Sequence, residues 1–396
     1  MGLASGMAPR LLVSAWVFGI AALAAACSGL PSSGPTAVDI AVNENSEVVQ
    51  GGYVIVDIDE RVASLAAAQP RQSFSRVFTD PGPAPDIRVG VGDAVQVTIW
   101  EAADGGLFSA SISDRSISAG SRTATLPEQV VSRDGTIRVP YAGRLKVAGL
   151  RPGDIEQEIV KALSGKAIEP QAVVTISKNF SNTVTVTGEV TSGARVPISA
   201  RGERLLEVVA AAGGIRAAAH ETFIRLTRGP ATANVAFNAI LSNPQENIYV
   251  KPGDVITVVR DPQTFTAFGG TGRNASVPFD AAGITLEEAI AKAGGLLDYR
   301  ADPAGVFLLR FEPTAYVAEL LPARSMPSAG NLIPVVYRLN LRDANSFFLA
   351  RAFPVKDKDI LYVANAPSDA VQKFLNLVGA VTNPVIAGAA VAGAVK

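Results

Sequence analysis

The chain has 396 residues, a formal net charge of −1 and an isoelectric point near 6.0. Nucleic-acid binding normally needs a clustered basic excess, so this charge balance excludes nucleic acid as a partner. Hydrophobic residues make up 48% of the chain but aromatic residues only 6%, which predicts cores of Val, Ile, Leu and Ala in two to four domains.

The first segment has the pattern of an export signal. A positive residue precedes an apolar run over residues 11–26, and Cys27, the single cysteine of the sequence, follows directly. We therefore predict a lipoprotein signal peptide over residues 1–26 and lipidation of Cys27. The alternative is a free cysteine beside an ordinary secretory cleavage site, since Ala24 stands where lipoprotein signals usually have leucine. Ser28 after the cysteine favours the outer membrane.

The next segment, residues 27–82, carries one strand pattern, over residues 53–58. We expect this strand to add to a domain further along the chain, while the segment as a whole runs back along the series of domains. A structure in which the strand packed only on the domain that directly follows it would contradict this expectation.

The following region alternates strand and turn patterns around one helix. Residues 91–100 predict a strand, and the Ser-, Ala- and Arg-rich residues 109–125 predict a mobile loop. Asp134 followed by glycine predicts a hairpin turn between two strands. Helical spacing of apolar residues predicts a helix over 152–163, and alternation predicts a strand over 172–177.

An internal duplication occupies the middle of the chain. Residues 183–262 align with residues 263–366 at a constant offset of 81 through a strand, a turn and a helix. The features that keep this offset are Gly188 with Gly269, residues 196–197 with 277–278, Leu205 with Leu286, Glu207 with Glu288, and the glycine pairs 213–214 and 294–295. Each copy therefore predicts a β-plus-α module in which one helix covers one sheet.

The end of each copy also matches, at a different offset. Residues 250–258 resemble residues 355–363 at an offset of 105, so the second copy carries about 24 inserted residues. We place this insertion in the proline-rich stretch around residues 313–334. The helices over 205–212 and 286–293 each end at a Gly-Gly pair, which is typical of a C-terminal helix stop.

The whole series resembles a known family, the Wza-type outer-membrane polysaccharide export lipoproteins. The residues that carry the resemblance are Gly92 and Asp93 with Trp100, residues 134–143, the helix of residues 149–163, residues 186–190, and residues 212–214. The resemblance implies an α+β fold with a polysaccharide export domain (83–182), a first β-grasp domain of the SLBB type (183–262) and a second one with an insertion (263–366). Lys358 departs from the pattern, because the first copy has Gly253 there.

The last segment, residues 367–396, predicts an amphipathic transmembrane helix. At ~1.5 Å per residue its 27 positions from residue 369 to 395 span roughly 40 Å, enough to cross a hydrocarbon core. Helical geometry puts weakly polar side chains on a lumen-facing side and apolar ones on a lipid-facing side. The lumen-facing residues are Gln372, Asn376, Gly379 and Asn383, and the lipid-facing residues are Phe374, Val378, Val381 and Val385. The alternatives are a tail packed on its own protein, or a helix that ends at Pro384 and is too short to span.

The functional hypothesis is an outer-membrane channel for capsular or exopolysaccharide, lipid-anchored and largely periplasmic. The resemblance implies a homo-oligomeric ring of about eight protomers, an inner-membrane polysaccharide co-polymerase as partner, contact with outer-membrane lipid, and no cofactor or metal. The alternative is a periplasmic glycan-binding lipoprotein that works with a separate β-barrel pore. An enzyme such as a glycan hydrolase is a third hypothesis, although no carboxylate pair is marked as catalytic.

Three other patterns are expected to be structural. The glycines of residues 269–272 lack the Lys-Ser/Thr of a phosphate loop and align with a turn in the sister copy. His220 is the only histidine, which excludes a multi-histidine metal site. Glu287 and Glu288 stand at a helix start, where they favour the helix dipole.

Overall fold

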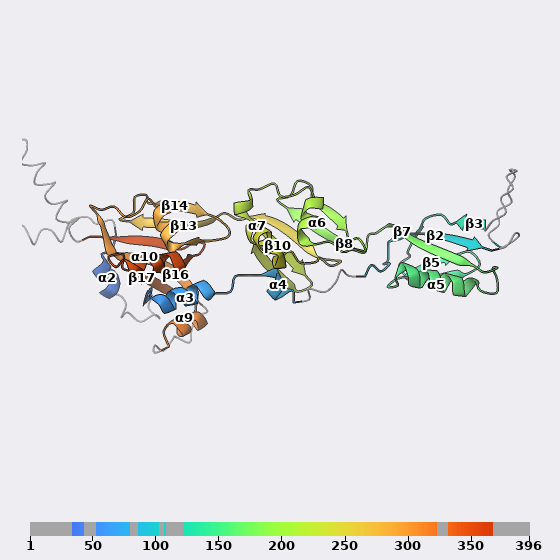
Figure 1. The fold of residues 1–396 in the computed structure, drawn as a ribbon, viewed down its shortest axis with the longest axis horizontal. Helices are drawn as coiled ribbons and strands as arrows, with labels where there is room; N and C mark the ends of the chain where they lie inside the picture. The colour runs from blue at the N-terminus through green and yellow to red at the C-terminus, as the bar shows by residue number, and fades with distance from the viewer. Residues whose placement is uncertain are drawn as a thin grey trace, which may run out of the picture. The chain divides into compact units, whose positions relative to one another are not determined.

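The computed structural model describes residues 34–42, 53–79, 86–102, 107, 122–322 and 332–366 (Figure 1). The chain divides into two compact units. One contains residues 1–70 and 263–396, and the other contains residues 71–262. The fold is α+β, as expected, with mixed sheets covered by short helices. Among the described residues no helix is long and apolar enough to cross a membrane.

In the predicted export domain, one sheet is covered by one helix. The sheet has the order β3-β2-β4, and β7 pairs with β2. Helix α5 packs Ile155, Ile159 and Leu163 into the core, and its bounds match the predicted helix. The elements of this domain are β2 (Ala94–Glu101), β3 (Arg122–Thr125), β4 (Gln129–Val130), β5 (Thr136–Val139), β6 (Gly143–Lys146), α5 (Pro152–Leu163) and β7 (Gln171–Lys178).

In this domain one local prediction was wrong and another was right only in part. The end of the predicted loop over residues 109–125 is strand β3, because these residues pair with β2 in an antiparallel ladder. The predicted turn at Asp134 exists between β4 and β5: the Thr136 hydroxyl and amide donate to the Asp134 carboxylate, and the Ser132 amide donates to the Thr136 carbonyl. The ladder of β5, however, is formed with β6 on its other side. The hairpin of β5 and β6 therefore closes through residues 140–142.

The first repeat is a five-stranded sheet in the order β11-β10-β12-β8-β9. Strand β8 lies parallel to β12, and the other pairs are antiparallel. Helix α6 buries Leu205, Val208 and Val209 against the sheet. The elements are β8 (Thr183–Gly188), β9 (Ala194–Pro197), α6 (Leu205–Ala211), η4 (Ala219–Glu221), β10 (Thr222–Arg228), β11 (Ala231–Ala236), α7 (Phe237–Ser242), η5 (Pro244–Glu246) and β12 (Val255–Arg260).

The main sheet of the second repeat has the same topology with one strand more, and β15 and β18 form a separate two-stranded sheet. The order of the main sheet is β1-β17-β16-β19-β13-β14, in which the last five strands correspond one by one to those of the first repeat. The predicted duplication is therefore confirmed in the strand order as well as in the sequence. The elements are β13 (Gln263–Gly269), β14 (Ala275–Phe279), β15 (Ile284–Thr285), α8 (Leu286–Lys292), β16 (Ala301–Pro313), α9 (Thr314–Leu320), β17 (Leu332–Leu339), α10 (Asn345–Ala352), β18 (Pro354–Val355) and β19 (Ile360–Asn365).

The insertion in the second repeat lies in the connection from β16 to β17. Ile224 pairs with Val235 in the first repeat, and Val306 pairs with Leu339 in the second. The offset between equivalent residues is thus 82 before the connection and 104 after it. The prediction of an insertion around residues 313–334 is confirmed, and part of it forms helix α9.

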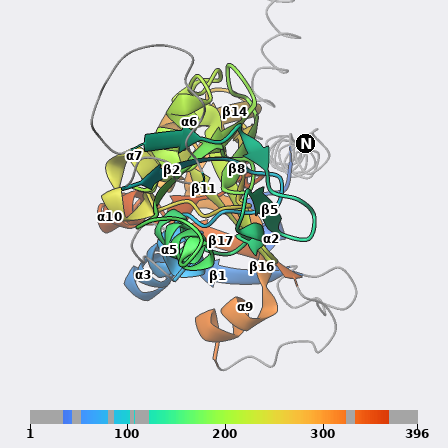
Figure 2. The same cartoon turned by 90° about the vertical axis from the view of Figure 1, so that its right-hand side faces the viewer.

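The N-terminal segment supplies elements to both repeats. Strand β1 (Val54–Asp57) pairs in parallel with β17, so the predicted strand adds to a downstream domain, as expected. Helices α2 (Ala37–Val42) and α3 (Glu60–Ala68) belong to the same unit, and α3 lies beside α9 in both views (Figure 1, Figure 2). Helix α4 (Phe74–Val77) instead packs on β11 of the first repeat.

Candidate functional site

The residues that the sequence assigned to membrane contact lie outside the described residues. They are Cys27, the lumen-facing Gln372, Asn376, Gly379 and Asn383, and the lipid-facing Phe374, Val378, Val381 and Val385. The signal peptide of residues 1–26 and the terminal segment of residues 367–396 also lie outside them. These assignments stay predictions, and the structure bears on them through the described residues next to each segment.

Those neighbouring residues meet on strand β19 of the second repeat. The Tyr362 hydroxyl donates a hydrogen bond to the Pro35 carbonyl at 2.6 Å. The Ala366 amide, just after the end of β19, donates to the Arg300 carbonyl at 2.7 Å. Tyr362 and Asn365 are three positions apart on the strand, which is about 10 Å at ~3.3 Å per residue. The chain that follows Cys27 and the chain that precedes residues 367–396 therefore approach the same end of one strand.

An apolar cluster holds the beginning of the N-terminal segment on this sheet. Ile40 of α2 and Ile55 of β1 are buried with side chains from β16, β17 and β19. The Tyr53 hydroxyl donates to the Ile40 carbonyl at 2.7 Å. Gly305 lies so close to Ala37 that an added Cβ would contact its side chain at 3.2 Å. Helix α2 is therefore a packed part of the second repeat.

Two arginines fasten the next part of the segment. Arg338 on β17 donates from Nε and Nη2 to the two carboxylate oxygens of Asp57, at 2.5 and 2.9 Å. Arg61 on α3 donates from Nη2 to the Leu320 carbonyl at 2.5 Å and so satisfies an orphan carbonyl at the C-terminus of α9. The N-terminal segment and the inserted helix thus secure each other on the second repeat.

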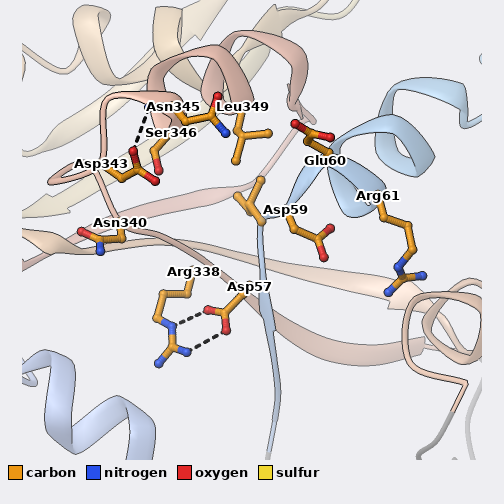
Figure 3. A pocket seen from close by; sticks show the side chains of 11 residues that line it. Asp57, Asp59, Glu60, Arg61, Arg338, Asn340, Asp343, Asn345, Ser346 and Leu349 are labelled. Carbon is orange, nitrogen blue, oxygen red and sulfur yellow. Dashed lines mark hydrogen bonds and ion pairs between the residues drawn. The ribbon is translucent and has the colours of Figure 1, made fainter.

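An open pocket of about 530 Å³ lies where the N-terminal segment meets β17 and α10 (Figure 3). Most of the residues that line it are of polar type and carry carboxylate, guanidinium, amide or hydroxyl groups. The lining residues are Asp57, Ile58, Asp59, Glu60, Arg61, Arg338, Asn340, Asp343, Asn345, Ser346 and Leu349. Groups of this kind exchange hydrogen bonds with hydroxyl-rich ligands.

A cluster of buried charges lies inside the second repeat. Arg310 is 5% exposed and forms ion pairs with Glu312 and Asp359, and Lys356 contacts Glu312 at 3.0 Å. Tyr337 donates its hydroxyl to Glu312 at 3.2 Å. Burial raises the pKa of Tyr337, which keeps this hydroxyl a donor, and burial also lowers the pKa of Lys356. Every charge has an opposite partner, so the cluster is a structural network and not a free acid or base.

The first repeat contains the same arginine in the equivalent place. Arg228 donates to both carboxylate oxygens of Asp254 at 2.9 and 2.7 Å, and to the Tyr249 carbonyl at 2.9 Å. In the second repeat the corresponding acceptors are Asp359 and the Pro354 carbonyl. Sequence reasoning missed this pair, although an aspartate directly before each closing strand was a visible signal for it.

Asp93 of the export domain also stands directly before a strand, as Asp254 and Asp359 do, but its partners are different. Asp93 is fully buried and accepts hydrogen bonds from the amides of Phe180 and Ser181, both at 2.7 Å, and from the Ser181 hydroxyl at 2.6 Å. The Gly90 amide donates to the same carboxylate at 2.8 Å. Four donors on one carboxylate fix the chain that leaves β7.

Two of the patterns that we expected to be structural, the glycine turn and Glu288, have structural roles. Gly188 and Gly269 both have positive φ, and a Cβ at either would overlap a carbonyl oxygen of the closing strand. Glu288 completes a capping box with Thr285 at the start of α8. His220 is largely exposed beside Glu221. Within the described ranges no group of three or more His, Cys, Asp or Glu residues is arranged to hold a metal ion.

Comparison with known proteins agrees with this architecture. Residues 81–177 match the model of the polysaccharide biosynthesis/export protein family, and residues 182–258 and 263–363 each match the SLBB domain. The capsule polysaccharide export protein BexD of Haemophilus influenzae is 39% identical over 377 residues, which cover 91% of this chain and 93% of that protein. The capsule polysaccharide export outer membrane protein CtrA of Neisseria meningitidis serogroup A is 40% identical over 373 residues, or 93% and 94% of the two chains.

A more distant relative has the same kind of name. The Vi polysaccharide export protein VexA/TviF of Salmonella typhi is 27% identical over 276 residues, which cover 69% of this chain and 73% of that protein. The resemblance drawn from the sequence is therefore confirmed by matches along nearly the whole chain. The chain belongs to the polysaccharide biosynthesis/export protein family and combines its export domain with two SLBB domains.

Proposed function

We propose that this chain exports capsular or exopolysaccharide across the outer membrane, as an oligomeric, lipid-anchored channel with a large periplasmic portion. Relatives with 39–40% identity are named capsule polysaccharide export proteins, and CtrA is named an outer membrane protein. In the proposal, Cys27 carries the lipid and residues 367–396 form the transmembrane helix of a ring of about eight protomers. An inner-membrane co-polymerase would supply the polymer.

The observation that supports this proposal most directly is the meeting of the two chain ends on β19. Pro35, eight residues after Cys27, contacts Tyr362, and the chain leaves the same strand after Asn365 toward residues 367–396. Seven residues from Cys27 to Gly34 reach at most about 25 Å when extended. A lipid on Cys27 and a helix that begins near residue 367 would thus enter one bilayer side by side.

The mechanism in this proposal is passive conduction. A ring would turn Asn376 and Asn383 toward water and the valine and phenylalanine side toward lipid, which lowers the free energy of a sugar polymer inside the hydrocarbon layer. The chain itself would supply no reaction and would need no cofactor. Incubation of purified protein with polymer should therefore release no new reducing ends.

The pocket of about 530 Å³ favours a second candidate, a periplasmic glycan-binding lipoprotein that serves a separate pore. The two candidates differ in the role of the C-terminal segment. Deletion of residues 368–396 should abolish surface polymer and surface exposure of the protein if this chain forms the pore. Unchanged export in a deletion strain with normal protein levels would reject the channel and favour the binding role.

A further inference from the structure

The two-stranded ribbon of β5 and β6 in the export domain has one apolar face and one basic face. Ile137 and Val139 are buried in the core, together with the half-buried Leu145. Because side chains alternate along a strand, Arg138, Arg144 and Lys146 lie on the opposite face, and all three are exposed. We call this face, with the turn of residues 140–142, the basic ribbon.

Like charges lie opposite each other on this face, although they repel. Arg138 lies directly opposite Arg144 in the antiparallel register, and Lys146 lies opposite Thr136. Side chains in such directly opposite positions have Cβ atoms about 4.5–5.5 Å apart, and like charges there destabilise the pair. Folding of this hairpin would proceed as well with polar residues at these positions, so its stability does not explain the arginines.

In the part of the chain that the structure describes, one acidic side chain lies near the cations of the ribbon, and of these cations it contacts only Arg144. Arg144 approaches Asp134 at 4.0 Å, but both side chains are more than half exposed. The same Asp134 carboxylate accepts the Thr136 hydroxyl at 2.9 Å. Among the described residues, neither Arg138 nor Lys146 forms an ion pair. Arg138 and Lys146 are therefore two exposed cations that no acidic side chain of the described residues pairs, and they can bind an external anion.

Tyr141, in the turn at the tip of the basic ribbon, has a strained backbone conformation. Tyr141 has φ of 65°, in the left-handed region that a bulky residue rarely adopts, and it is 55% exposed. The Lys166 ammonium donates to the Tyr141 carbonyl at 3.0 Å and holds the turn. An exposed tyrosine offers a flat apolar face with a polar end, the combination that packs against the C–H face of a sugar ring.

We propose that the basic ribbon is a contact site for carboxylates or phosphates carried by the exported polymer. This inference rests on the proposed export function. Paired guanidinium groups form bidentate, charge-assisted hydrogen bonds with such anions, whereas a neutral polymer offers only hydroxyls. The tyrosine at the tip adds contact with the sugar ring next to the charge.

The test compares an anionic with a neutral polymer on the full chain purified in detergent. Binding of alginate and of dextran of matched length is measured at two salt concentrations for the wild type and for Arg138→Ala/Arg144→Ala. The matched control is Lys161→Ala/Lys292→Ala, which removes two exposed helix cations and the same total charge. Oligomeric state is measured for each protein by light scattering.

The wild type and the control should bind alginate and not dextran, with binding that weakens as salt rises. The ribbon variant should bind alginate at least about tenfold more weakly with an unchanged oligomeric state. Tyr141→Gly should fold at least as stably, because glycine tolerates positive φ, and yet bind more weakly. A structural role for this tyrosine would leave binding unchanged.

Normal alginate binding by the ribbon variant would overturn the inference, and so would three other outcomes. These are equal binding of dextran by the wild type, equal loss of binding in the control, or a ribbon variant that changes oligomeric state but not alginate affinity. The last outcome would assign the ribbon to contact between protein chains. If the ribbon variant binds normally while deletion of residues 368–396 still abolishes export, only this inference fails and the proposed function stands.

Discussion

Phe74 links the N-terminal segment to the first repeat, and its removal should weaken that repeat specifically. Its side chain is fully buried among the apolar residues of the first repeat, 6.2 Å from the Phe78 ring between centroids. The Glu246 carboxylate fixes the helix by accepting the Phe74 amide and the Ser73 hydroxyl, both at 2.6 Å. Phe74→Ala leaves a cavity at a site whose backbone is held in place.

Such a substitution costs about 3–5 kcal/mol of stability when the surroundings cannot collapse. At 1.4 kcal/mol per factor of ten, the equilibrium constant for local opening rises roughly a hundred- to a few thousand-fold. Val77→Ala on the same helix is the control, because Val77 is 43% exposed and should cost less than about 0.5 kcal/mol. Hydrogen exchange on the full chain measures both variants.

In Phe74→Ala, the backbone amides of peptides from β10 to β12 should lose protection from hydrogen exchange, while those of peptides from β16 to β19 should keep it. The second repeat belongs to the other compact unit and serves as an internal reference. Equal protection in the two variants would refute the argument, since it would mean that α4 does not contribute to the first core. Loss of protection in both repeats would refute the assignment of α4 to the first repeat alone.

Three further substitutions test other parts of the structure. Gly188→Ala should destabilise the first repeat by at least about 2 kcal/mol in thermal unfolding, because the added Cβ meets a carbonyl oxygen at positive φ; tolerance would contradict the turn geometry. Asp359→Asn should lower the free energy of unfolding by about 3–5 kcal/mol, because it leaves Arg310 buried beside a neutral group. Unchanged stability would contradict a structural role for this ion pair. Asp57→Asn should cost only about 0–1 kcal/mol because its carboxylate is 67% exposed, and a larger loss would show that the pair locks β1.

The duplication made most of the repeat architecture predictable from sequence. Leu205 and Leu286 open helices in equivalent places, and the closing strands β12 and β19 keep the offset of 105. Apolar spacing gave the α5 helix with its observed ends because Pro152 starts it and a buried Leu163 ends it. Periodicity is reliable where one face of an element is buried along its whole length.

Local signals failed where tertiary pairing decides the structure. The glycine after Asp134 is a common hairpin marker, yet the hairpin closes at Tyr141, a residue whose type argues against a left-handed turn. Strand β3 has no apolar alternation and exists because β2 pairs with it. Phe78 and Arg228 could not be placed in contact from sequence, because 150 positions separate them and only the fold brings the Arg228 guanidinium over the Phe78 ring.

The central claim is that several copies of this chain form an export channel whose lipid anchor and terminal helix enter one membrane. An image of the detergent-solubilised oligomer by electron microscopy tests it most directly. The account predicts a closed ring of about eight subunits, with a collar of helices from residues 367–396 next to the second repeat and close to residue 34. A monomeric particle, or a ring whose second repeat lies at the end opposite the collar, would contradict it.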